Sequence, residues 1–460
     1  MEWIDDRSAP LLTDLYELTM IASYVAHGMT APATFDLYVR ALPANRNFLI
    51  ACGLEHALHY LEHLRFNREA IAAVEGLGIF DQGFLDYLAG FRFSGEVWAM
   101  EEGEAAFAGE PLLRVTAPLP ESQLVESYLL NCLTFQTLIA SKAARIAIAC
   151  GGRQFADFSL RRDHGPNASL LVARAAYLGG ASSTSNVLAA TRLRIPPSGT
   201  MGHSYVMAFS REIDAFRQFA HDFPDRAIVL IDTYDVATGA RRAAKVAREL
   251  AERGHRLRGV RIDSGDLAVE ARKARAILDA DGAAEVPIFL SGDLDEWKID
   301  ELVRNDVPAD AFGVGTQLGT SGDAPSLGGV YKLAVDAGTP RMKLSHGKLT
   351  LPGRKQVYRF KEGDGETISG DVIGLEDEAI SGARPLLVPM MKDGRLLRDG
   401  VDQVHALGEA RERCARSLLS LPPSLRALSP APPYPVHWSR RLQQLVDQTR
   451  SELISDDPLT

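Results

Sequence analysis

The sequence predicts an α/β protein whose middle part forms an irregular, TIM-like α/β barrel. Two observations favour this fold class. Between residues 150 and 330, short apolar runs recur about every thirty residues, the length of one strand–helix unit, and a polar or glycine-rich tail follows each run. Helical patterns, such as residues 238–254 and 267–282, lie between the runs. Successive units of this kind indicate a parallel sheet that closes into a barrel, with chemistry gathered at the carboxyl ends of its strands.

The segment before the barrel has a different rhythm. Residues 13–26 carry apolar positions at helical spacing, and residues 33–42 alternate like a strand. Residues 53–65 resemble an amphipathic helix, and short runs broken by glycines over residues 93–117 are typical of β-hairpins. This part of the chain is therefore expected to be mixed α+β.

The segment after the barrel begins with a strand-like run at residues 331–335. Its proline-rich stretch at residues 420–435 is expected to run extended over the surface. The sequence thus predicts an N-terminal domain at 1–140, the barrel at 141–330 and a C-terminal segment at 331–460.

The composition is that of an ordinary globular protein. Of the 460 residues, 46% are hydrophobic and 24% are charged, which excludes a mainly disordered chain. Sixty acidic and fifty basic residues leave a formal charge of −10. Such a charge disfavours nucleic-acid binding, but it allows a small anionic substrate to be held by local arginines.

The spacing of the cysteines and the N-terminal residues indicate the cellular compartment of the protein. The four cysteines lie far apart without a CxxC pair, which favours a reducing environment. The first residues lack the basic start and apolar run of a signal peptide, and no apolar stretch reaches the ~20 residues that cross a bilayer. We expect a cytoplasmic protein with no membrane or nucleic-acid partner.

Glycines and hydroxyls follow the last apolar run of the barrel region. Gly313, Gly315 and Thr316 could close backbone N–H groups on a phosphate, because glycine removes the side chains that would block an anion. A loop that needs its glycines only for turns fits these residues equally well. The loop matches neither the P-loop nor the dinucleotide fingerprint.

Acidic residues end three other runs. Arg261 and Asp263 occur in RIDSGDL, Asp293 in LSGDLDE and Asp232 in LIDTYDV. Carboxylates at strand ends suit Mg²⁺ or ribose hydroxyls, and the arginine could neutralise an anion. A single motif of this kind more often caps a helix, but three motifs one unit apart favour a site. LIDTYDV also resembles a phosphoribosyl-pyrophosphate loop, yet it lacks the second adjacent acid.

An aromatic residue and a histidine complete the candidate set. Phe158 precedes Arg161, a pairing that suits a flat anionic ring, although a buried phenylalanine followed by solvated arginines is the simpler interpretation. His203, expected at or near a strand end, could be a base, a ligand or a phosphoryl acceptor, or a hydrogen-bonded core histidine. The motif alone does not decide between these roles.

Taken in order, these motifs resemble those of nicotinate phosphoribosyltransferases, which are type II phosphoribosyltransferases. The resemblance runs from about residue 10 to residue 360 and rests on LLTDLYELTM, LRR, GTMGHS, LIDTYDV, VRIDSGDL, LSGDLDE, FGVGTQLGTS and LPGRKQVYR. It implies an irregular α/β barrel plus a second α+β domain built from both chain ends. It also implies a homodimer with shared active sites.

The resemblance further implies the reaction. Nicotinate and phosphoribosyl pyrophosphate would give nicotinate mononucleotide and pyrophosphate in NAD salvage, with ATP as co-substrate, hydrolysed through a phosphohistidine at His203. Mg²⁺ would arrive on pyrophosphate or ATP, with no fixed protein metal site. Phe158 and the partner subunit's Tyr16 would enclose the pyridine ring.

The remaining roles follow from the same resemblance. Arg161 and Arg261 would hold the ring carboxylate and phosphates, while Asp232, Asp263 and Asp293 would surround ribose and Mg-pyrophosphate. Glycines and a threonine would cradle the 5′-phosphate, namely Gly292, Gly313, Gly315 and Thr316. Basic residues of the partner would meet pyrophosphate or ATP, namely Arg40, Lys332, Lys343 and Lys355.

One position favours nicotinate over nicotinamide. Ser185 aligns with an aspartate of the nicotinamide-using relatives, and a serine can donate to a ring carboxylate that an aspartate would repel. Gly202 and residues 163–168 depart from the family pattern around the ring pocket. Nicotinamide or quinolinate transfer on the same fold, a metal-dependent barrel lyase or hydrolase, and a silent ligand-binding barrel are the alternatives.

Overall fold

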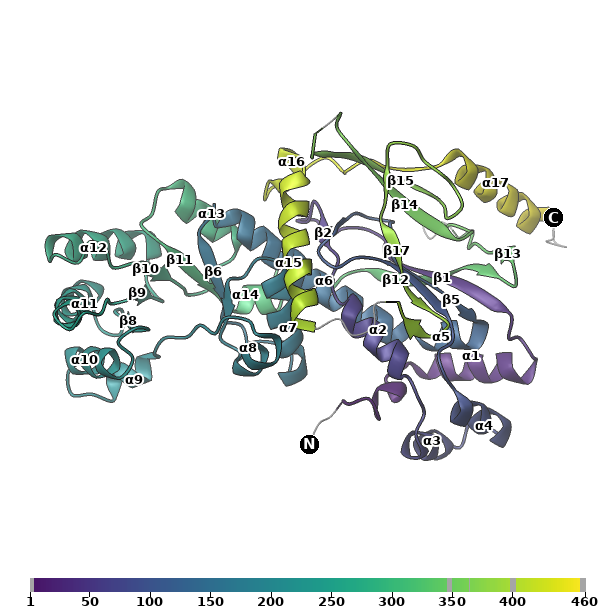
Figure 1. Cartoon of the computed structure of the whole chain (residues 1–460), viewed down its shortest axis with the longest axis horizontal. Coiled ribbons are helices and arrows are strands. Elements are labelled where there is room, and N and C mark those ends of the chain that lie inside the picture. Colours follow the sequence, from purple (N-terminus) through teal and green to yellow (C-terminus); the bar gives the residue numbers. More distant parts are fainter. Residues whose placement is uncertain (1–3, 346–349, 364, 398–402, 456–460) are drawn as a thin grey trace. The chain divides into compact units, whose positions relative to one another are not determined.

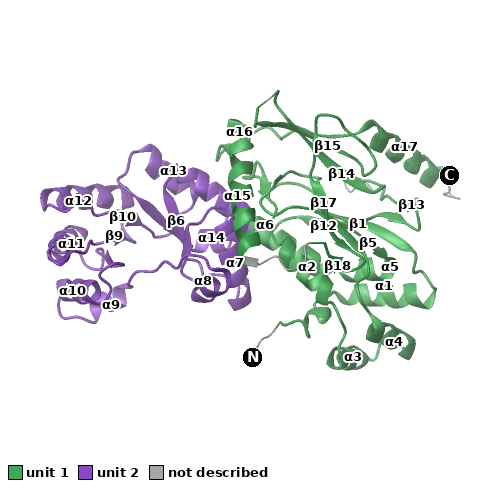
Figure 2. Ribbon diagram, viewed as in Figure 1, with its two compact units in different colours: residues 1–138, 326–460 green, residues 139–325 purple. Residues whose placement is uncertain are grey.

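A computed structural model of the chain describes residues 4–345, 350–363, 365–397 and 403–455. The chain forms two compact units, coloured separately in Figure 2. Unit 1 comprises residues 1–138 and 326–460, and unit 2 comprises residues 139–325. Unit 1 is therefore assembled from both ends of the chain, and unit 2 is inserted between them. The predicted boundaries lay at 140 and 330.

Unit 1 combines an antiparallel sheet with peripheral helices (Figure 1). Its N-terminal elements are η1 (Ala9–Leu11), α1 (Leu15–Ala26), β1 (Pro32–Val39), β2 (Leu49–Ile50), α2 (Leu54–His63), α3 (Arg68–Glu75), α4 (Gln82–Gly90), β3 (Glu96–Met100), β4 (Ala105–Ala106), β5 (Pro111–Pro118), α5 (Leu119–Leu124) and the start of α6 (Glu126–Ala149). Its C-terminal elements are β12 (Gly329–Asp336), β13 (Thr339–Pro340), β14 (Lys355–Lys361), β15 (Ile368–Leu375), β16 (Arg384–Pro385), β17 (Leu387–Lys392), β18 (Arg395–Leu396), α15 (Gln403–Ser420), α16 (Pro423–Arg426), β19 (Val436–Trp438) and α17 (Arg440–Ser455).

The main sheet of unit 1 interleaves the two ends of the chain. Its seven strands run in the order β13-β12-β1-β5-β3-β17-β18, so β1 lies between β12 and β5 and pairs antiparallel with both. A second sheet, β16-β14-β15-β19, carries α17 against its face through Ile373, Leu442 and Val446. The strands that were predicted at residues 33–42 and 331–335 are thus neighbours in space.

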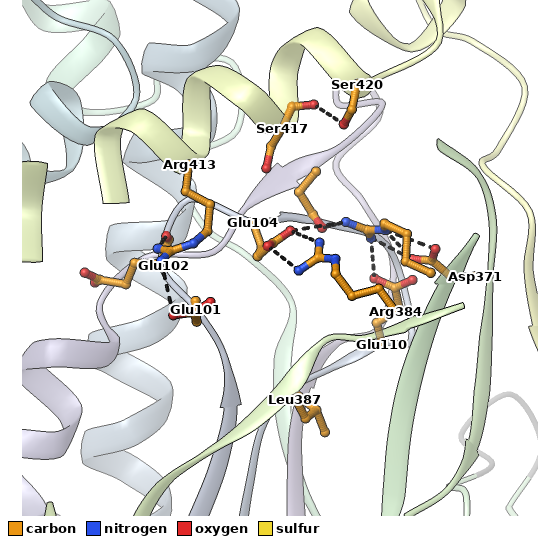
Figure 3. A network of polar contacts seen from close by, with 12 residues as sticks. Glu101, Glu102, Glu104, Glu110, Asp371, Arg384, Leu387, Arg413, Ser417 and Ser420 are labelled. Carbon is orange, nitrogen blue, oxygen red and sulfur yellow. Dashed lines mark hydrogen bonds and ion pairs between the residues drawn. The ribbon is translucent and has the colours of Figure 1, made fainter. Parts of the chain in front are cut away.

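A buried polar network ties the second half of unit 1 to the first (Figure 3). Arg359 donates to Asp371 at 2.6 Å, and these side chains are only 4% and 0% exposed. Arg384 makes a two-pronged contact with Glu104, both N–O distances being 2.9 Å. Nearby, burial and the adjacent Asp371 raise the pKa of Glu110 well above its usual value. The network fastens β14 and β15 to residues 104–110.

Unit 2 consists of strand–helix units. Its elements are the remainder of α6, then β6 (Gln154–Asp157), α7 (Pro166–Leu178), β7 (Ser183–Thr184), α8 (Val187–Leu193), α9 (His203–Met207), α10 (Glu212–Asp222), β8 (Ile228–Leu230), α11 (Val236–Ala251), β9 (Gly259–Ile262), α12 (Leu267–Ala280), β10 (Ile288–Leu290), α13 (Glu296–Arg304), β11 (Ala311–Val314) and α14 (Thr316–Gly319). The predicted helices at 238–254 and 267–282 correspond to α11 and α12.

The six strands of unit 2 form one parallel sheet in the order β7-β6-β11-β10-β9-β8. The α/β class is confirmed, with one correction to the closed barrel that the repeats predicted. Among the described residues β7 and β8 remain the two edges, so the sheet is a curled half-barrel. Helices α10, α11 and α12 pack side by side, and α11 and α12 cover β9 (Figure 1).

The proline-rich stretch at residues 420–435 is less extended than predicted. It contains the short helix α16, and its residues Leu421, Leu425 and Tyr434 are buried, so the stretch packs into unit 1. All four cysteines are buried, and none forms a disulfide within the described residues. In the part of the chain that the structure describes, no helix combines the length and apolarity needed to span a bilayer.

Candidate active site

The carboxyl ends of β6, β9, β10 and β11 surround a cavity of about 240 Å³ in unit 2. Parallel strands that end at one edge deliver their following residues to the same place, as expected for an α/β sheet. Most of the predicted site residues of unit 2 lie here. The lining residues are Phe158, Arg161, Arg162, Arg261, Asp263, Ser291, Gly292, Asp293, Gly313, Gly315 and Thr316.

An arginine, an aspartate and a serine form the polar floor of this cavity. Arg261 Nη2 lies 2.6 Å from Asp263 Oδ1, and its Nε donates to Ser291 Oγ at 2.8 Å. The same Ser291 hydroxyl donates to Asp263 Oδ1 at 2.5 Å. These contacts hold Arg261 in one orientation, and a ligand in the cavity can reach the pair because the two side chains are 14% and 27% exposed. Such a fixed guanidinium suits a carboxylate or phosphate ligand.

Phe158 supplies a flat apolar wall. The Arg261 guanidinium carbon lies 5.4 Å from the centre of its ring, within cation–π range. A Cβ at Gly313 would lie 2.5 Å from two of the ring carbons, so glycine is required for the ring to occupy this position. The Phe158 backbone N–H donates to the Val314 carbonyl at 2.8 Å, which fixes the ring against β11. A planar ligand can therefore stack on a ring whose position the backbone sets.

The acidic motifs separate into two roles. The second acid of each motif caps the helix that follows: Asp235 accepts from Thr238 N, Asp266 from Val269 N and Asp295 from Lys298 N. The first acids, Asp232, Asp263 and Asp293, remain at the strand ends. The capping alternative is thus correct for one acid of each pair and leaves the other available for ligands.

Asp232 is bound on one side only. Its Oδ2 accepts from the Asp263 backbone N–H at 2.9 Å and from Ser264 Oγ at 2.6 Å. Its Oδ1 is buried and has no hydrogen-bond partner among the described residues. A buried carboxylate oxygen without a donor is costly, and a ligand hydroxyl or a water on Mg²⁺ would relieve that cost.

His203 is placed differently from the expectation. It is the first residue of the short helix α9, after Gly202 at the N-cap, and not the end of a strand. Its Nδ1 lies 3.1 Å from Thr233 Oγ1 and its Nε2 lies 4.0 Å from Asp263 Oδ2. The imidazole is 41% exposed, which rules out the core histidine that the motif also allowed. It faces the same acids as the cavity.

Ser185 follows β7, next to β6. Its backbone N–H donates to the Asp157 carbonyl at 2.9 Å, immediately before Phe158. The residue therefore lies beside the aromatic wall at the same edge of the sheet, although it is not among those that line the cavity.

The remaining predicted residues belong to unit 1. Tyr16 lies on α1 with half of its surface exposed. Arg40, Lys332 and Lys355 line one cavity of about 320 Å³, which Lys343 does not line. The Lys355 ammonium lies 2.7 Å from each of three protein acceptors, namely the Leu351 carbonyl, the Gly353 carbonyl and Asp36 Oδ2. Its three N–H groups are thus engaged within unit 1.

Sequence reasoning missed several polar side chains of the site. Ser291 lies between Arg261 and Asp263, Ser264 donates to Asp232, and Thr233 contacts His203. Each of them directly precedes or follows a residue of a recognised motif, so their position at a strand end was the available signal. Within the described residues, no group of three or more His, Cys, Asp or Glu side chains is arranged to hold a metal ion alone.

Comparisons with known proteins identify the family. Three family models match the chain in order: the nicotinate phosphoribosyltransferase N-terminal domain over residues 11–134, the nicotinate phosphoribosyltransferase family over 153–332, and its C-terminal domain over 380–446. The nicotinate phosphoribosyltransferase pncB2 of Mycobacterium tuberculosis is 43% identical over 433 residues, covering 94% of this chain and 92% of that protein. The nicotinate phosphoribosyltransferase of Bacillus subtilis is 40% identical and covers 83% of this chain and 79% of its own.

Solved structures show the same fold. The crystal structure of human nicotinic acid phosphoribosyltransferase superimposes with a TM-score of 0.85 at 30% identity, covering 95% of this chain and 99% of that one. The nicotinate-nucleotide pyrophosphorylase of Pyrococcus furiosus gives a TM-score of 0.74 at 25% identity, with 91% and 98% covered.

The half-barrel and its strand-end site, taken with these likenesses, define an enzyme of the phosphoribosyltransferase class. Within that class the chain belongs to the nicotinate phosphoribosyltransferase family. The resemblance stated from the motifs alone is confirmed.

Proposed function

We propose that the chain joins nicotinate to the anomeric carbon of phosphoribosyl pyrophosphate, releasing pyrophosphate and nicotinate mononucleotide, and couples this transfer to ATP hydrolysis. The observation that carries the proposal is the single cavity at which Phe158, Arg261 and Asp263 meet. It combines a surface for a flat ring, a fixed cation for an acid, and a carboxylate near the place where positive charge would form.

The ring is bound by stacking and by charge. Phe158 takes one face of the pyridine, and Tyr16 of the partner subunit takes the other. Arg161 and Arg261 hold the ring carboxylate and phosphate oxygens, which an arginine fork can contact through two N–H groups. Ser185 donates toward the carboxylate, which favours nicotinate over nicotinamide. Stacking aligns the pyridine nitrogen behind the bond that breaks.

The sugar polyphosphate is bound by acids and backbone. Departure of pyrophosphate leaves positive charge on the ribose, which Asp232 and Asp263 stabilise. These two residues and Asp293 would hold Mg²⁺ that arrives on pyrophosphate, and the ion would neutralise the leaving group. The Oδ1 atom of Asp232, which has no hydrogen-bond partner within the described part of the chain, supports this assignment. The 5′-phosphate lies against the backbone of Gly292, Gly313, Gly315 and Thr316.

ATP acts through His203. Its exposed imidazole near Asp263 is accessible to a phosphoryl group, which would bring a charge of about −1.5 to −2 to the edge of the cavity. Added charge there would reorganise the arginines and so alter affinity for the substrates. Arg40, Lys332 and Lys343 of the partner subunit meet the pyrophosphate or ATP phosphates in this proposal, within a cytoplasmic homodimer. Lys355 is left out of this set because protein acceptors engage its three N–H groups.

The decisive assay measures nicotinate mononucleotide with phosphoribosyl pyrophosphate, with and without ATP. Turnover of nicotinate should exceed that of nicotinamide and quinolinate, and exclusive use of nicotinamide would refute the proposal. His203→Ala should abolish phosphoryl labelling and ATP hydrolysis while slow transfer persists. Labelling that survives in this variant would remove the histidine from the mechanism.

Shared sites are tested by mixing two inactive variants. Tyr16→Ala and Arg161→Ala dimers should regain part of the activity after subunit exchange, because one mixed site carries both native residues. Absence of recovery after proven exchange would show that each subunit has a self-contained site.

A further inference from the structure

Two carboxylates share one serine hydroxyl beside the arginines of the cavity. Ser159 Oγ lies 2.6 Å from Asp157 Oδ1 and 3.2 Å from Asp163 Oδ2. The backbone N–H groups of Arg162 and Asp163 both donate to the Ser159 carbonyl, so this contact closes the turn that carries Arg161 and Arg162. Ser159 is fully buried, and Asp163 is half-buried.

The number of protons decides which contacts are possible. A serine hydroxyl donates one proton, so it can donate to only one of the two carboxylates. Asp157 also accepts from the Ser159 backbone N–H at 2.9 Å and from Thr184 Oγ1 at 2.7 Å. Burial raises the pKa of Asp157, and these donors act in the opposite direction by favouring its ionised form. The shorter of the two contacts of the Ser159 hydroxyl is the one to Asp157, so its proton is assigned there. With that proton directed to Asp157, a proton on the Asp163 carboxyl would let Asp163 donate to Ser159 Oγ across the 3.2 Å contact.

The surroundings of Asp163 favour that proton. Burial and the nearby Asp157 raise the pKa of Asp163 to about 6, against the opposing effects of Ser159 and His164. A Cβ at Gly319 would lie 2.0 Å from Asp163 Oδ1, so the backbone of α14 lies against this oxygen, and α14 (TQLG) carries no charged side chain. That oxygen is buried and has no hydrogen-bond partner among the described residues. Ionised Asp163 would face the Asp157 carboxylate, and the neighbouring His164 acts in the opposite direction.

We propose that Asp163 is a positioning residue whose protonated carboxyl holds the turn bearing Arg161 and Arg162 against Ser159. When Asp163 ionises, this hydrogen bond is lost and the turn is released from β6. Binding of the aromatic acid therefore weakens as pH rises through the range in which Asp163 titrates. The inference rests on the proposed function, because it concerns the arginine that is assigned there to the substrate.

The first measurement is independent of activity. Asp163→Asn imitates the protonated acid, since its amide donates to Ser159 at every pH. The folded protein holds its proton more tightly than the unfolded chain, so native stability should fall relative to Asp163→Asn as pH rises from about 4 to 6.5. Thermal unfolding of the full-length protein at pH 5.0, 6.0 and 7.5 measures this difference in stability. Asp306→Asn is the matched control, because Asp306 is exposed in the same unit and has a positive φ that asparagine adopts readily.

The second measurement is the KM for nicotinate at saturating phosphoribosyl pyrophosphate, at pH 5.5 and 7.5. The wild-type KM should rise about two- to tenfold more than that of Asp163→Asn, the effect of one net hydrogen bond, with kcat changed less. Ser159→Ala removes the shared hydroxyl and should raise KM at both pH values. If the protein forms no product, equilibrium binding of inorganic pyrophosphate to the same variants replaces KM.

The outcomes are separable. A stability difference between wild type and Asp163→Asn that stays constant with pH overturns the proposal, whatever the enzyme catalyses. A pH-dependent stability difference combined with identical KM profiles also overturns it, because the turn would then not position Arg161. Failure to form nicotinate mononucleotide refutes the proposed function, while the stability and pyrophosphate measurements still decide the role of Asp163.

Discussion

Each unit contains an arginine–aspartate ion pair with the same N–O distance, but the two pairs have different roles. Arg359 and Asp371 in unit 1, and Arg261 and Asp263 in unit 2, each have an N–O distance of 2.6 Å. The first pair is 4% and 0% exposed, whereas the second is 14% and 27% exposed. Tyr434 also donates to Asp371 at 3.0 Å, so the buried pair is saturated within the protein. Accessibility, more than contact distance, separates a pair that holds the fold from one that can hold a ligand.

The largest effect is expected from breaking the buried pair. Asp371→Ala leaves the Arg359 guanidinium buried, with Glu104 at 3.7 Å and Glu110 at 3.9 Å as the acids that remain near it. Loss of one partner of a buried pair costs about 3–5 kcal/mol. Urea unfolding should show unit 1 destabilised by this amount. A change below about 1 kcal/mol would mean that the network is better solvated than its burial indicates.

A smaller change in stability but a large change in activity is expected in unit 2. Arg261→Ala removes the fixed cation of the cavity and should lower kcat/KM by about 10²–10³-fold, the range for one preorganised electrostatic group. Steady-state kinetics gives this loss, and the unfolding curve should shift little. If Arg261→Ala unfolds the unit and activity is lost only for that reason, the distinction between the two pairs fails.

A buried acid with no ion-pair partner among the described residues extends the comparison. Glu17 is fully buried, and its Oε2 accepts from Gln123 at 2.6 Å, but burial still raises its pKa to about 7. The folded state binds the proton more tightly than the unfolded chain, so stability should fall as pH rises from about 4.5 to 7. Glu17→Gln should remove this dependence and raise Tm at pH 8 by roughly 2–6 °C relative to wild type. Equal Tm differences at pH 5 and pH 8 would contradict the assignment.

The smallest effect is expected from the half-exposed pair of the network in Figure 3. Arg384 is 53% exposed although its partner Glu104 is buried, and exposed pairs contribute about 0–1 kcal/mol. Arg384→Ala should therefore change the free energy of unfolding by no more than about 1 kcal/mol in the same urea experiment. A loss as large as that of Asp371→Ala would show that Glu104 depends on Arg384 for compensation.

The strands, most helices and the strand-end site of unit 2 follow from sequence periodicity. Apolar runs give the strands, and the residues that follow them gather at one edge because all the strands are parallel. The open edges at β7 and β8 could not be predicted this way, since closure depends on strand pairing and not on repeat length. His203 was misplaced because apolar residues on both sides of it imitate a strand, whereas Gly202 starts a helix there.

Side-chain contacts between distant residues were also outside the reach of the sequence. Lys355 is basic and lies in a basic stretch, which favours a phosphate ligand, but nothing in the pattern indicates that three protein acceptors surround its ammonium. Likewise the pairing of Ser159 with two carboxylates depends on the turn after β6. Motifs identify residue types at an edge, and only packing decides which of them remain available.

The position of β1 between β12 and β5 has a consequence for synthesis on the ribosome. About 290 residues separate the end of β1 at Val39 from the start of β12 at Gly329. Synthesis proceeds at roughly 5–20 residues per second, so about 15–60 s pass between the synthesis of β1 and that of β12. During this time one edge of β1 is unpaired, while the residues between the two strands, unit 2 included, are synthesised and can fold. The nascent chain during that interval is a natural substrate for chaperones, and truncation before residue 329 leaves an open strand prone to association.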